Sequence, residues 1–275
     1  MKKETDLKRM LQIIYMVVKK SNNKIYVLID EYDHFANDIL AVGDGLFYKD
    51  TIRARGFVRD FYETLKIGAK SVIDRIFMTG ISPIMLDDLT SGFNITENLT
   101  MNPLLNEMLG FTEEELVYLI GEVEIDFEQQ ELLAELKSNY NGYLFSAKGN
   151  TRVYNPDMIL SFFNSWQQIG EYPENLIDDN VKTDYGRLQR LIVNKKNKDI
   201  LEEIILQEEI VSDIVTRFSF DRMYDQDYFI SLLFYMGLLT IDKKYRSRLI
   251  LKIPNYVIKT IYWRFLQKSI REEIR

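Results

Sequence analysis

Residues 25–29, with the sequence Ile-Tyr-Val-Leu-Ile, form an apolar run that is followed directly by the two acids Asp30 and Glu31. The run is rich in β-branched and aromatic residues and shows no polar alternation, which is typical of a strand buried on both faces of a parallel sheet. Residues 75–80 form a second run of this kind, and residues 51–66 between them have helical spacing. Strand, helix and strand at this distance predict a right-handed crossover unit and therefore an α/β fold.

The polar residues at the ends of these two strands are the candidate site. In open α/β sheets, ligands bind beyond the carboxyl ends of the strands, where Asp30, Glu31 and Thr79 are expected. Two carboxylates suit magnesium–nucleotide chemistry, in which one holds the hydrated metal and the other polarises an attacking water. A threonine hydroxyl on the neighbouring strand adds a donor that senses a phosphate or orients the water. The alternative is that polar residues simply follow a strand that has ended, and that Thr79 is an ordinary β-branched strand residue.

The chain beyond this unit is predicted to be mainly helical. Residues 107–111 are compatible with a third short strand, and Thr112 and Glu115 have the spacing of a capping box that opens a helix. Asp126 is expected to cap the next helix, and the Asn-Pro pair at 155–156 the one after it.

Residues 239–241 and 249–251 predict a hairpin between two helices, which looks like a small winged-helix module. The cations of this basic hairpin are Lys243, Lys244, Arg246, Arg248 and Lys252. Such a cluster either contacts DNA phosphates or is a solvated surface, and the second is the commoner case.

Composition narrows the chemistry that this chain can perform. The formal net charge is −7, so no global cationic field holds nucleic acid or anionic lipid unspecifically. The sequence has no cysteine and one histidine, which removes disulfides, thiolate zinc sites, cysteine nucleophiles and histidine-based triads.

The longest apolar stretch, residues 230–241, is too short to span a bilayer, and charged residues interrupt the first turns of the chain. We therefore expect a cytoplasmic protein without a membrane segment.

Several blocks of the sequence resemble, in order, the AAA-ATPase-like domain of bacterial proteins that are often fused to a PD-(D/E)XK nuclease-like domain. They are IYVLIDEYD, FMTGISP with SGFN, LGFTEEEL, NYNGYLF, VYNPDMILSFF, and SLLFYMGLLTI with LKIPNYV, and they extend from about Ile25 to about Tyr262. The resemblance implies ATP and Mg²⁺ as ligands of Asp30 and Glu31. It implies that Asp30 holds the metal, that Glu31 is the catalytic base of the Walker B pair, and that Thr79 is the catalytic sensor on the adjacent strand.

The fold implied by this resemblance is an α/β remnant of a P-loop NTPase (AAA/ASCE-type) parallel sheet with helices, over residues 1–122. A mainly helical lid and a winged-helix-like C-terminal segment are expected over residues 123–275. The Walker A loop G-x-x-x-x-G-K-[ST], which cradles phosphates, is missing, because no Gly-Lys dipeptide occurs in the sequence.

We therefore expect a family member that has lost its N-terminal part, and that by itself binds ATP very weakly and hydrolyses it negligibly. The loss would leave residues 25–29 as an exposed apolar edge, which predicts direct closure of the gap, self-association or completion by the missing N-terminal fragment. The rival hypothesis is a non-enzymatic protein-interaction or DNA-binding module that uses the basic hairpin.

Overall fold

The computed structural model describes residues 7–34, 57–81, 83, 93–123, 128–170, 173, 176, 195–218, 222 and 225–273. The chain divides into two compact units: unit 1 comprises residues 1–97 and 215–223, and unit 2 comprises residues 98–214 and 224–275. The helices and strands of unit 1 are α1 (Leu7–Lys20), β1 (Ile25–Ile29), α4 (Phe57–Ala69) and β2 (Ile73–Met78).

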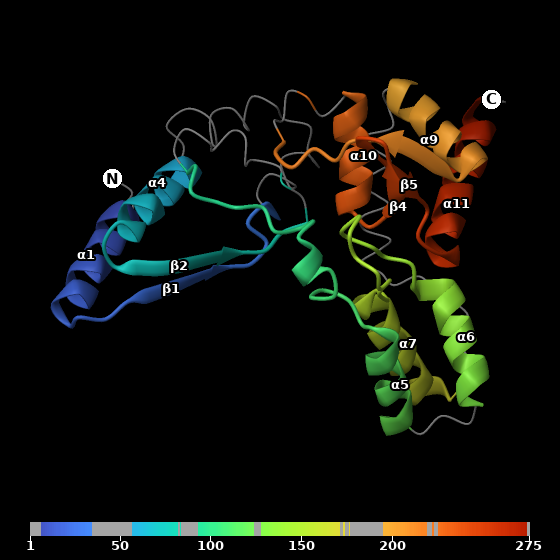
Figure 1. The fold of residues 1–275 in the computed structure, drawn as a ribbon, viewed down its shortest axis with the longest axis horizontal. Coiled ribbons are helices and arrows are strands. Elements are labelled where there is room, and N and C mark those ends of the chain that lie inside the picture. The colour runs from blue at the N-terminus through green and yellow to red at the C-terminus, as the bar shows by residue number, and fades with distance from the viewer. Residues whose placement is uncertain are drawn as a thin grey trace. The chain divides into compact units, whose positions relative to one another are not determined.

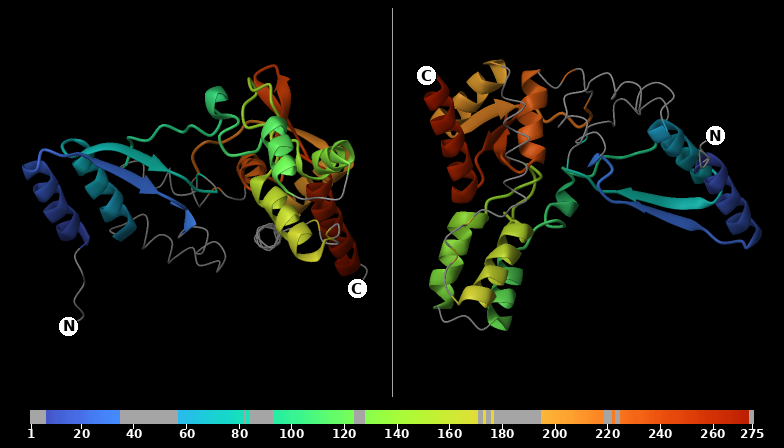
Figure 2. Two further views of the ribbon diagram at one scale, coloured as in Figure 1. Left: turned by 90° about the horizontal axis from the view of Figure 1, so that it is seen from below. Right: turned by 180° about the vertical axis from the view of Figure 1, so that it is seen from behind.

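In unit 1, β1 and β2 form a two-stranded parallel sheet. Tyr26 lies opposite Arg75, and Ile29 lies opposite Met78. Figures 1 and 2 show α1 and α4 side by side along this sheet. Both predicted strands are present, with β2 beginning and ending two residues earlier than expected. The expected burial on both faces is wrong: Tyr26 and Leu28 of β1 are exposed on one face, because no second layer of described residues covers it.

Helix α4 contributes one face to the core of unit 1. Its side chains Val58, Tyr62 and Leu65 are buried, because they recur on one face of the helix and that face packs against the sheet. The Tyr15 hydroxyl of α1 donates a hydrogen bond to the Thr64 carbonyl at 3.3 Å, which joins the two helices.

The first half of unit 2 is helical. It contains the short 3₁₀ helix η2 (Pro103–Leu105) and the α-helices α5 (Glu113–Glu122), α6 (Gln129–Tyr140) and α7 (Pro156–Ile169). The predicted capping box is confirmed: the Thr112 hydroxyl accepts from the Glu115 N–H, and the Glu115 carboxylate accepts from the Thr112 N–H. Asn155 caps α7 as expected, and its side chain accepts the Met158 N–H at 3.1 Å.

Two sequence-based expectations about this half have a different outcome. Residues 107–111 do not form a strand: they lie mostly in turns, and only Phe111 makes a single antiparallel bridge, to Tyr154. The preceding Asn106 is buried and accepts the N–H groups of Phe145 and Ser146, so this segment is held by a side chain instead of a strand ladder. Asp126 lies outside the described residues, and α6 begins after residue 128.

The second half of unit 2 combines helices with an antiparallel sheet. Its elements are α9 (Lys195–Gln207), β3 (Glu209–Ser212), α10 (Gln226–Tyr235), β4 (Thr240–Tyr245), β5 (Arg248–Lys252) and α11 (Tyr256–Glu273). The predicted hairpin is formed by β4 and β5, and β3 pairs with the other edge of β5, giving the order β3-β5-β4. The inner side chains of this sheet pack with α7, α9, α10 and α11 in one apolar cluster, in which Phe229, Leu251 and Tyr262 are fully buried.

The fold class is thus mixed α/β, with a parallel pair in unit 1 and a three-stranded antiparallel sheet in unit 2. Within the described ranges, no helix has the length and apolar character needed to cross a membrane.

Candidate functional site

Strands β1 and β2 remain hydrogen-bonded to each other just beyond their carboxyl ends. The Thr79 N–H donates to the Ile29 carbonyl at 2.8 Å, and the Tyr32 N–H donates to the Thr79 carbonyl at 2.9 Å. This pairing fixes the main chain of the two acids that follow β1 against the residue that follows β2. Asp30, Glu31 and Thr79 therefore lie together at one edge of the sheet.

The side chains of Asp30 and Thr79 are in direct contact. The Thr79 hydroxyl donates to Asp30 Oδ1 at 2.5 Å, and the Glu31 N–H donates to the same oxygen at 3.0 Å. Asp30 Oδ2 accepts no hydrogen bond from the residues that the structure describes. One oxygen of the carboxylate is thus fixed, and the other is available to a ligand.

Glu31 has a left-handed backbone with φ +50°, a conformation that costs a residue with a Cβ about 1–2 kcal/mol. The turn that holds it is closed by the His34 N–H, which donates to the Glu31 carbonyl at 2.9 Å. The Glu31 side chain is 66% exposed, and its Oε2 lies 3.4 Å from His34 Nδ1. Both the second acid and the only histidine of the chain therefore face solvent beside Asp30.

Asp33 belongs to the same turn, and sequence reasoning does not identify it as a site residue. Asp33 is 1% exposed, and its Oδ1 accepts a hydrogen bond from the Ile81 N–H at 3.1 Å. This hydrogen bond ties the loop after β1 to the loop after β2. The only local signal was its spacing, three residues after Asp30 in the motif Asp-Glu-Tyr-Asp.

Gly80 has no side chain, and the Asp33 carboxylate packs where its Cβ would lie. A Cβ at position 80 would lie 2.4 Å from Asp33 Oδ1 and 2.6 Å from Tyr32 Cε1. The negative charge of Asp33 also reaches α4: burial, and to a lesser extent this charge, raise the pKa of Tyr62 to about 12. Asp33 therefore connects the candidate site to the core of unit 1.

The oxygen atoms at this edge fit one mode of magnesium binding. Mg²⁺ commonly keeps several waters and binds through one or two carboxylates together with substrate phosphates. Among the described residues no group of three or more His, Cys, Asp or Glu side chains is arranged to hold a metal ion. Asp30 Oδ2 alone is suited to a hydrated ion that a phosphate would complete, so the site fits a shared Mg²⁺ and does not resemble an all-protein cage.

The basic hairpin, which is the second candidate site, is partly neutralised. Lys252 Nζ lies 2.6 Å and Lys243 Nζ 3.5 Å from the Asp242 carboxylate, and Arg152 lies 3.3 Å from it. Burial raises the pKa of Asp242, but the three cations lower it by more, so that the pKa lies below its ordinary value. Part of the positive charge of the hairpin is therefore balanced by Asp242.

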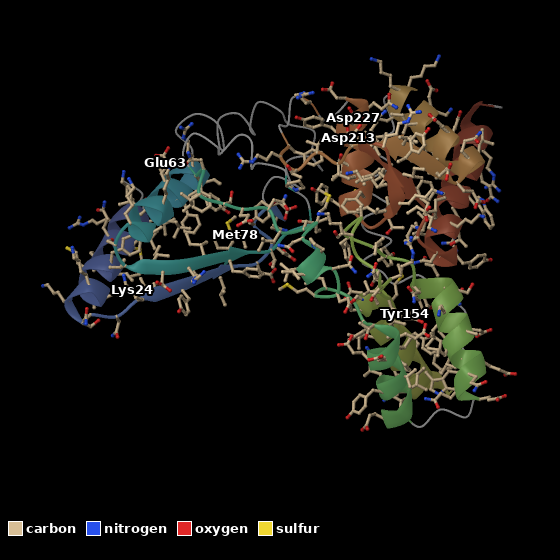
Figure 3. All side chains as sticks on the ribbon, viewed as in Figure 1. Lys24, Glu63, Met78, Tyr154, Asp213 and Asp227 are labelled. Atoms are coloured by element: carbon tan, nitrogen blue, oxygen red, sulfur yellow. The ribbon has the colours of Figure 1, made fainter. Side chains whose placement is uncertain are left out.

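Arg248 of the hairpin is paired as well. It lies 3.8 Å from Asp213 and 3.6 Å from Asp227, and Figure 3 labels both acids. Lys244 makes no ion pair within the part of the chain that the structure describes, and the Arg246 guanidinium lies over the Tyr245 ring, 5.4 Å from its centre. The cations that remain at the tip of the basic hairpin are therefore Lys244 and Arg246.

Comparison with known proteins bears on the first site. No curated protein and no solved structure matches the chain. Residues 1–90 match the model of a family described as predicted AAA-ATPase, and this stretch contains α1, β1, α4 and β2 with all the residues of the candidate site. The resemblance that the motif around Asp30 suggested is thereby confirmed as a match to the AAA-ATPase-like family model over residues 1–90.

Proposed function

We propose that the edge formed by Asp30, Glu31 and Thr79 is the metal- and water-handling part of an ATP-hydrolysing site. In this proposal Asp30 holds Mg²⁺ through water, Glu31 polarises the attacking water and accepts its proton, and Thr79 fixes the orientation of Asp30. When bound, Mg²⁺ neutralises charge on the phosphate oxygens. His34 is placed to bind the Glu31 carboxylate and so to influence its orientation.

The observation that carries the proposal is the hydrogen bond between Thr79 and Asp30 Oδ1 at 2.5 Å. It holds the metal-binding carboxylate in one orientation and leaves the second oxygen accessible. The left-handed backbone of Glu31 supports the same conclusion, because strained residues concentrate at functional sites. The family of residues 1–90 adds ATP and Mg²⁺ as ligands in general terms.

The affinity for ATP is proposed to be low for this chain by itself. A phosphate cradle makes about four charge-assisted hydrogen bonds of ~1.5–3 kcal/mol each, whereas micromolar binding requires only about 8 kcal/mol in total. No Gly-Lys dipeptide occurs in the 275 residues, so the phosphate-binding lysine loop would have to come from outside them. The activity of Asp30 and Glu31 then depends on that partner segment.

The metal part of the proposal is testable without ATP. Mn²⁺, a paramagnetic substitute for Mg²⁺, is expected to broaden the amide NMR signals of Asp30, Glu31 and Thr79 at low millimolar concentration. Asp30→Asn is expected to abolish this broadening, whereas Asp74→Asn, which removes an exposed acid of β2, should leave it unchanged. Broadening that persists in the Asp30→Asn variant would refute the assignment of the metal site.

The strands and helices of the two units can be assigned to the parts of a P-loop NTPase. We propose that β1 and β2 are the Walker B and sensor strands of a P-loop-type sheet. Helices α6 and α7 would then belong to the helical lid, and α10, the basic hairpin and α11 would form a winged-helix-like module. The order helix, hairpin, helix within a single apolar cluster supports the winged-helix-like module.

A second candidate function, duplex DNA binding, rests on the exposed tip of the basic hairpin. Lys244, Tyr245 and Arg246 lie there, and Tyr245 is 51% exposed. Binding to a short duplex should weaken as salt increases, because it depends on phosphate contacts. The double variant Lys244→Glu with Arg246→Glu should remove it, while Lys19→Glu with Lys20→Glu, which changes the net charge equally, should not. Equal effects of both double variants would exclude a specific role of the hairpin.

A further inference from the structure

The outer edge of strand β1 lacks the charged residues and prolines that usually keep other strands from pairing with an edge. Among the described residues it pairs with β2 alone, and its five residues include no charge, no proline and no glycine. Edge strands normally carry such residues, because unpaired N–H and C=O groups attract other strands. Strand β2 does carry them, since Asp74 and Arg75 are both exposed. Within the described ranges, the β1 edge is therefore the open side of this sheet.

The surfaces next to this edge are apolar. Tyr26 is 69% and Leu28 78% exposed, on the face of β1 that points away from the helices. On α1, which has no buried residue, Met10, Ile13 and Val17 form an exposed stripe at helical spacing. A parallel pair is normally covered on both faces, so this arrangement leaves apolar surface for a partner to bury.

We propose that the partner is a second copy of this chain, whose β1 pairs antiparallel with β1 about a two-fold axis at Val27. The two sheets then join into one sheet of four strands, β2-β1-β1-β2. The helices of both copies lie on the same face of it, because the axis is perpendicular to the sheet. The inference concerns assembly and does not depend on nucleotide binding.

The register follows from side-chain alternation and charge. Residues directly opposite each other in an antiparallel pair point to the same face of the sheet. A register shifted by one residue from the pairing centred on Val27 would oppose residues of different faces, so such registers are excluded. Of the registers that remain, the one centred on Val27 places Lys24 opposite Asp30 of the second copy, and both residues are exposed. It also places Tyr26 opposite Leu28 of the second copy, an aromatic–aliphatic pair of the kind that stabilises antiparallel strands. Figure 3 labels Lys24 at the beginning of β1.

This geometry has a consequence for the candidate site. Lys24 of the second copy lies beside Asp30, at the carboxyl end of β1. Each copy thus contributes one lysine to the edge of the other's sheet, and the two contacts are equivalent by symmetry.

The first test is the oligomeric state of the full chain, by sedimentation velocity over a hundredfold range of concentration. We expect a concentration-dependent dimer. Leu28→Lys should weaken dimerisation at least tenfold, whereas Leu206→Lys, a matched control at a residue of α9 that is 76% exposed, should not. A chain that stays monomeric throughout, or a dimer that both variants leave unchanged, would overturn the proposal.

The second test addresses the register. Lys24→Asp and Asp30→Lys should each weaken the homodimer, because like charges then face each other across the axis. An equimolar mixture of the two variants should recover dimerisation, since every pair in the mixed dimer is attractive. Circular dichroism of each variant verifies that its secondary structure is retained. Failure of the mixture to associate better than the separate variants would exclude this register.

Cysteine crosslinking provides an independent check, because the natural sequence contains no cysteine. In Val27→Cys the two thiols lie opposite each other on the axis, within the Cα separation of about 4.4–6.8 Å that a disulfide requires. With diamide as oxidant, this variant should form a covalent dimer rapidly and Leu206→Cys should not. Equal crosslinking of the two variants would contradict the antiparallel pairing.

Discussion

The Thr79 hydroxyl donates a 2.5 Å hydrogen bond to the Asp30 carboxylate, although the two residues are 49 positions apart in the sequence. The contact exists because β1 and β2 are parallel neighbours that end at the same edge of the sheet. It couples the strand-end acid to the adjacent strand, and it is the most specific geometric feature of the candidate site.

Thr79→Val is expected to lower the stability of unit 1 by about 1 kcal/mol, the net value of one such hydrogen bond. Valine keeps the β-branched shape, so packing is preserved and only the donor is lost. Native-state hydrogen exchange of the β1 amides measures the change, and Thr79→Ser, which retains the hydroxyl, should restore most of it. Identical protection in the valine variant and the unmodified chain would contradict the role assigned to this contact.

Gly80→Ala is expected to destabilise unit 1 by about 1–3 kcal/mol, as overpacking typically does. The added methyl group would meet Asp33 Oδ1 at 2.4 Å and the Tyr32 ring at 2.6 Å, so the turn that holds Glu31 must move. Gly121→Ala is a suitable control, because nothing lies within 4 Å of its Cβ and alanine favours a helix. Hydrogen exchange that shows no difference between the two variants would argue against the tight approach at Gly80.

Alkaline pH is expected to destabilise unit 1 through Tyr62. Its pKa in the folded chain is about 12, against an ordinary value of 10, because it is buried and lies near the Asp33 charge. The stabilisation is complete below pH 10 and is lost as pH rises from 10 toward 12, since the unfolded chain releases this proton first. The loss from this residue is on the order of 2 kcal/mol, and Tyr62→Phe should remove it from the pH profile of β1 hydrogen exchange. An unchanged profile in the phenylalanine variant would refute the assignment.

In unit 2, Gly142→Ala is expected to be among the most destabilising of small substitutions, at more than about 2 kcal/mol. Gly142 has φ +115°, and a Cβ there would lie 2.1 Å from the Pro254 carbonyl oxygen. Gly170→Ala separates the two causes, because Gly170 has φ +73° with open space around its Cβ, so that alanine meets only backbone strain. Both tryptophans lie in unit 2, so fluorescence-monitored urea unfolding reports on this unit selectively. Equal losses from the two alanines would indicate that the contact with Pro254 relaxes freely.

Elements with a strong local signal were predictable from the sequence. The run at 25–29 forms a strand with the predicted bounds, although one of its faces is exposed. Thr112 and Glu115 specify a helix start by their spacing, and they make the expected cap contacts. Because the two strands were placed in one crossover unit, the meeting of Asp30 with Thr79 also followed from the sequence.

Features that depend on distant contacts were not predictable in this way. Residues 107–111 look like a strand by composition, yet Leu109 is 67% exposed and the segment is anchored by the side chain of Asn106. The short strand β3 was missed because its four residues carry little local information and its order comes from pairing with β5. Asp33 was overlooked because an acid in a loop normally faces water, whereas here the loop after β2 buries it.

The decisive experiment is a calorimetric titration of the full chain with ATP and Mg²⁺, with Glu31→Gln as the companion variant. We expect no saturation in the micromolar range, because the proposed metal edge at Asp30 and Glu31 lacks the lysine loop that grips a triphosphate. Saturable micromolar binding of ATP by the unmodified chain would contradict it.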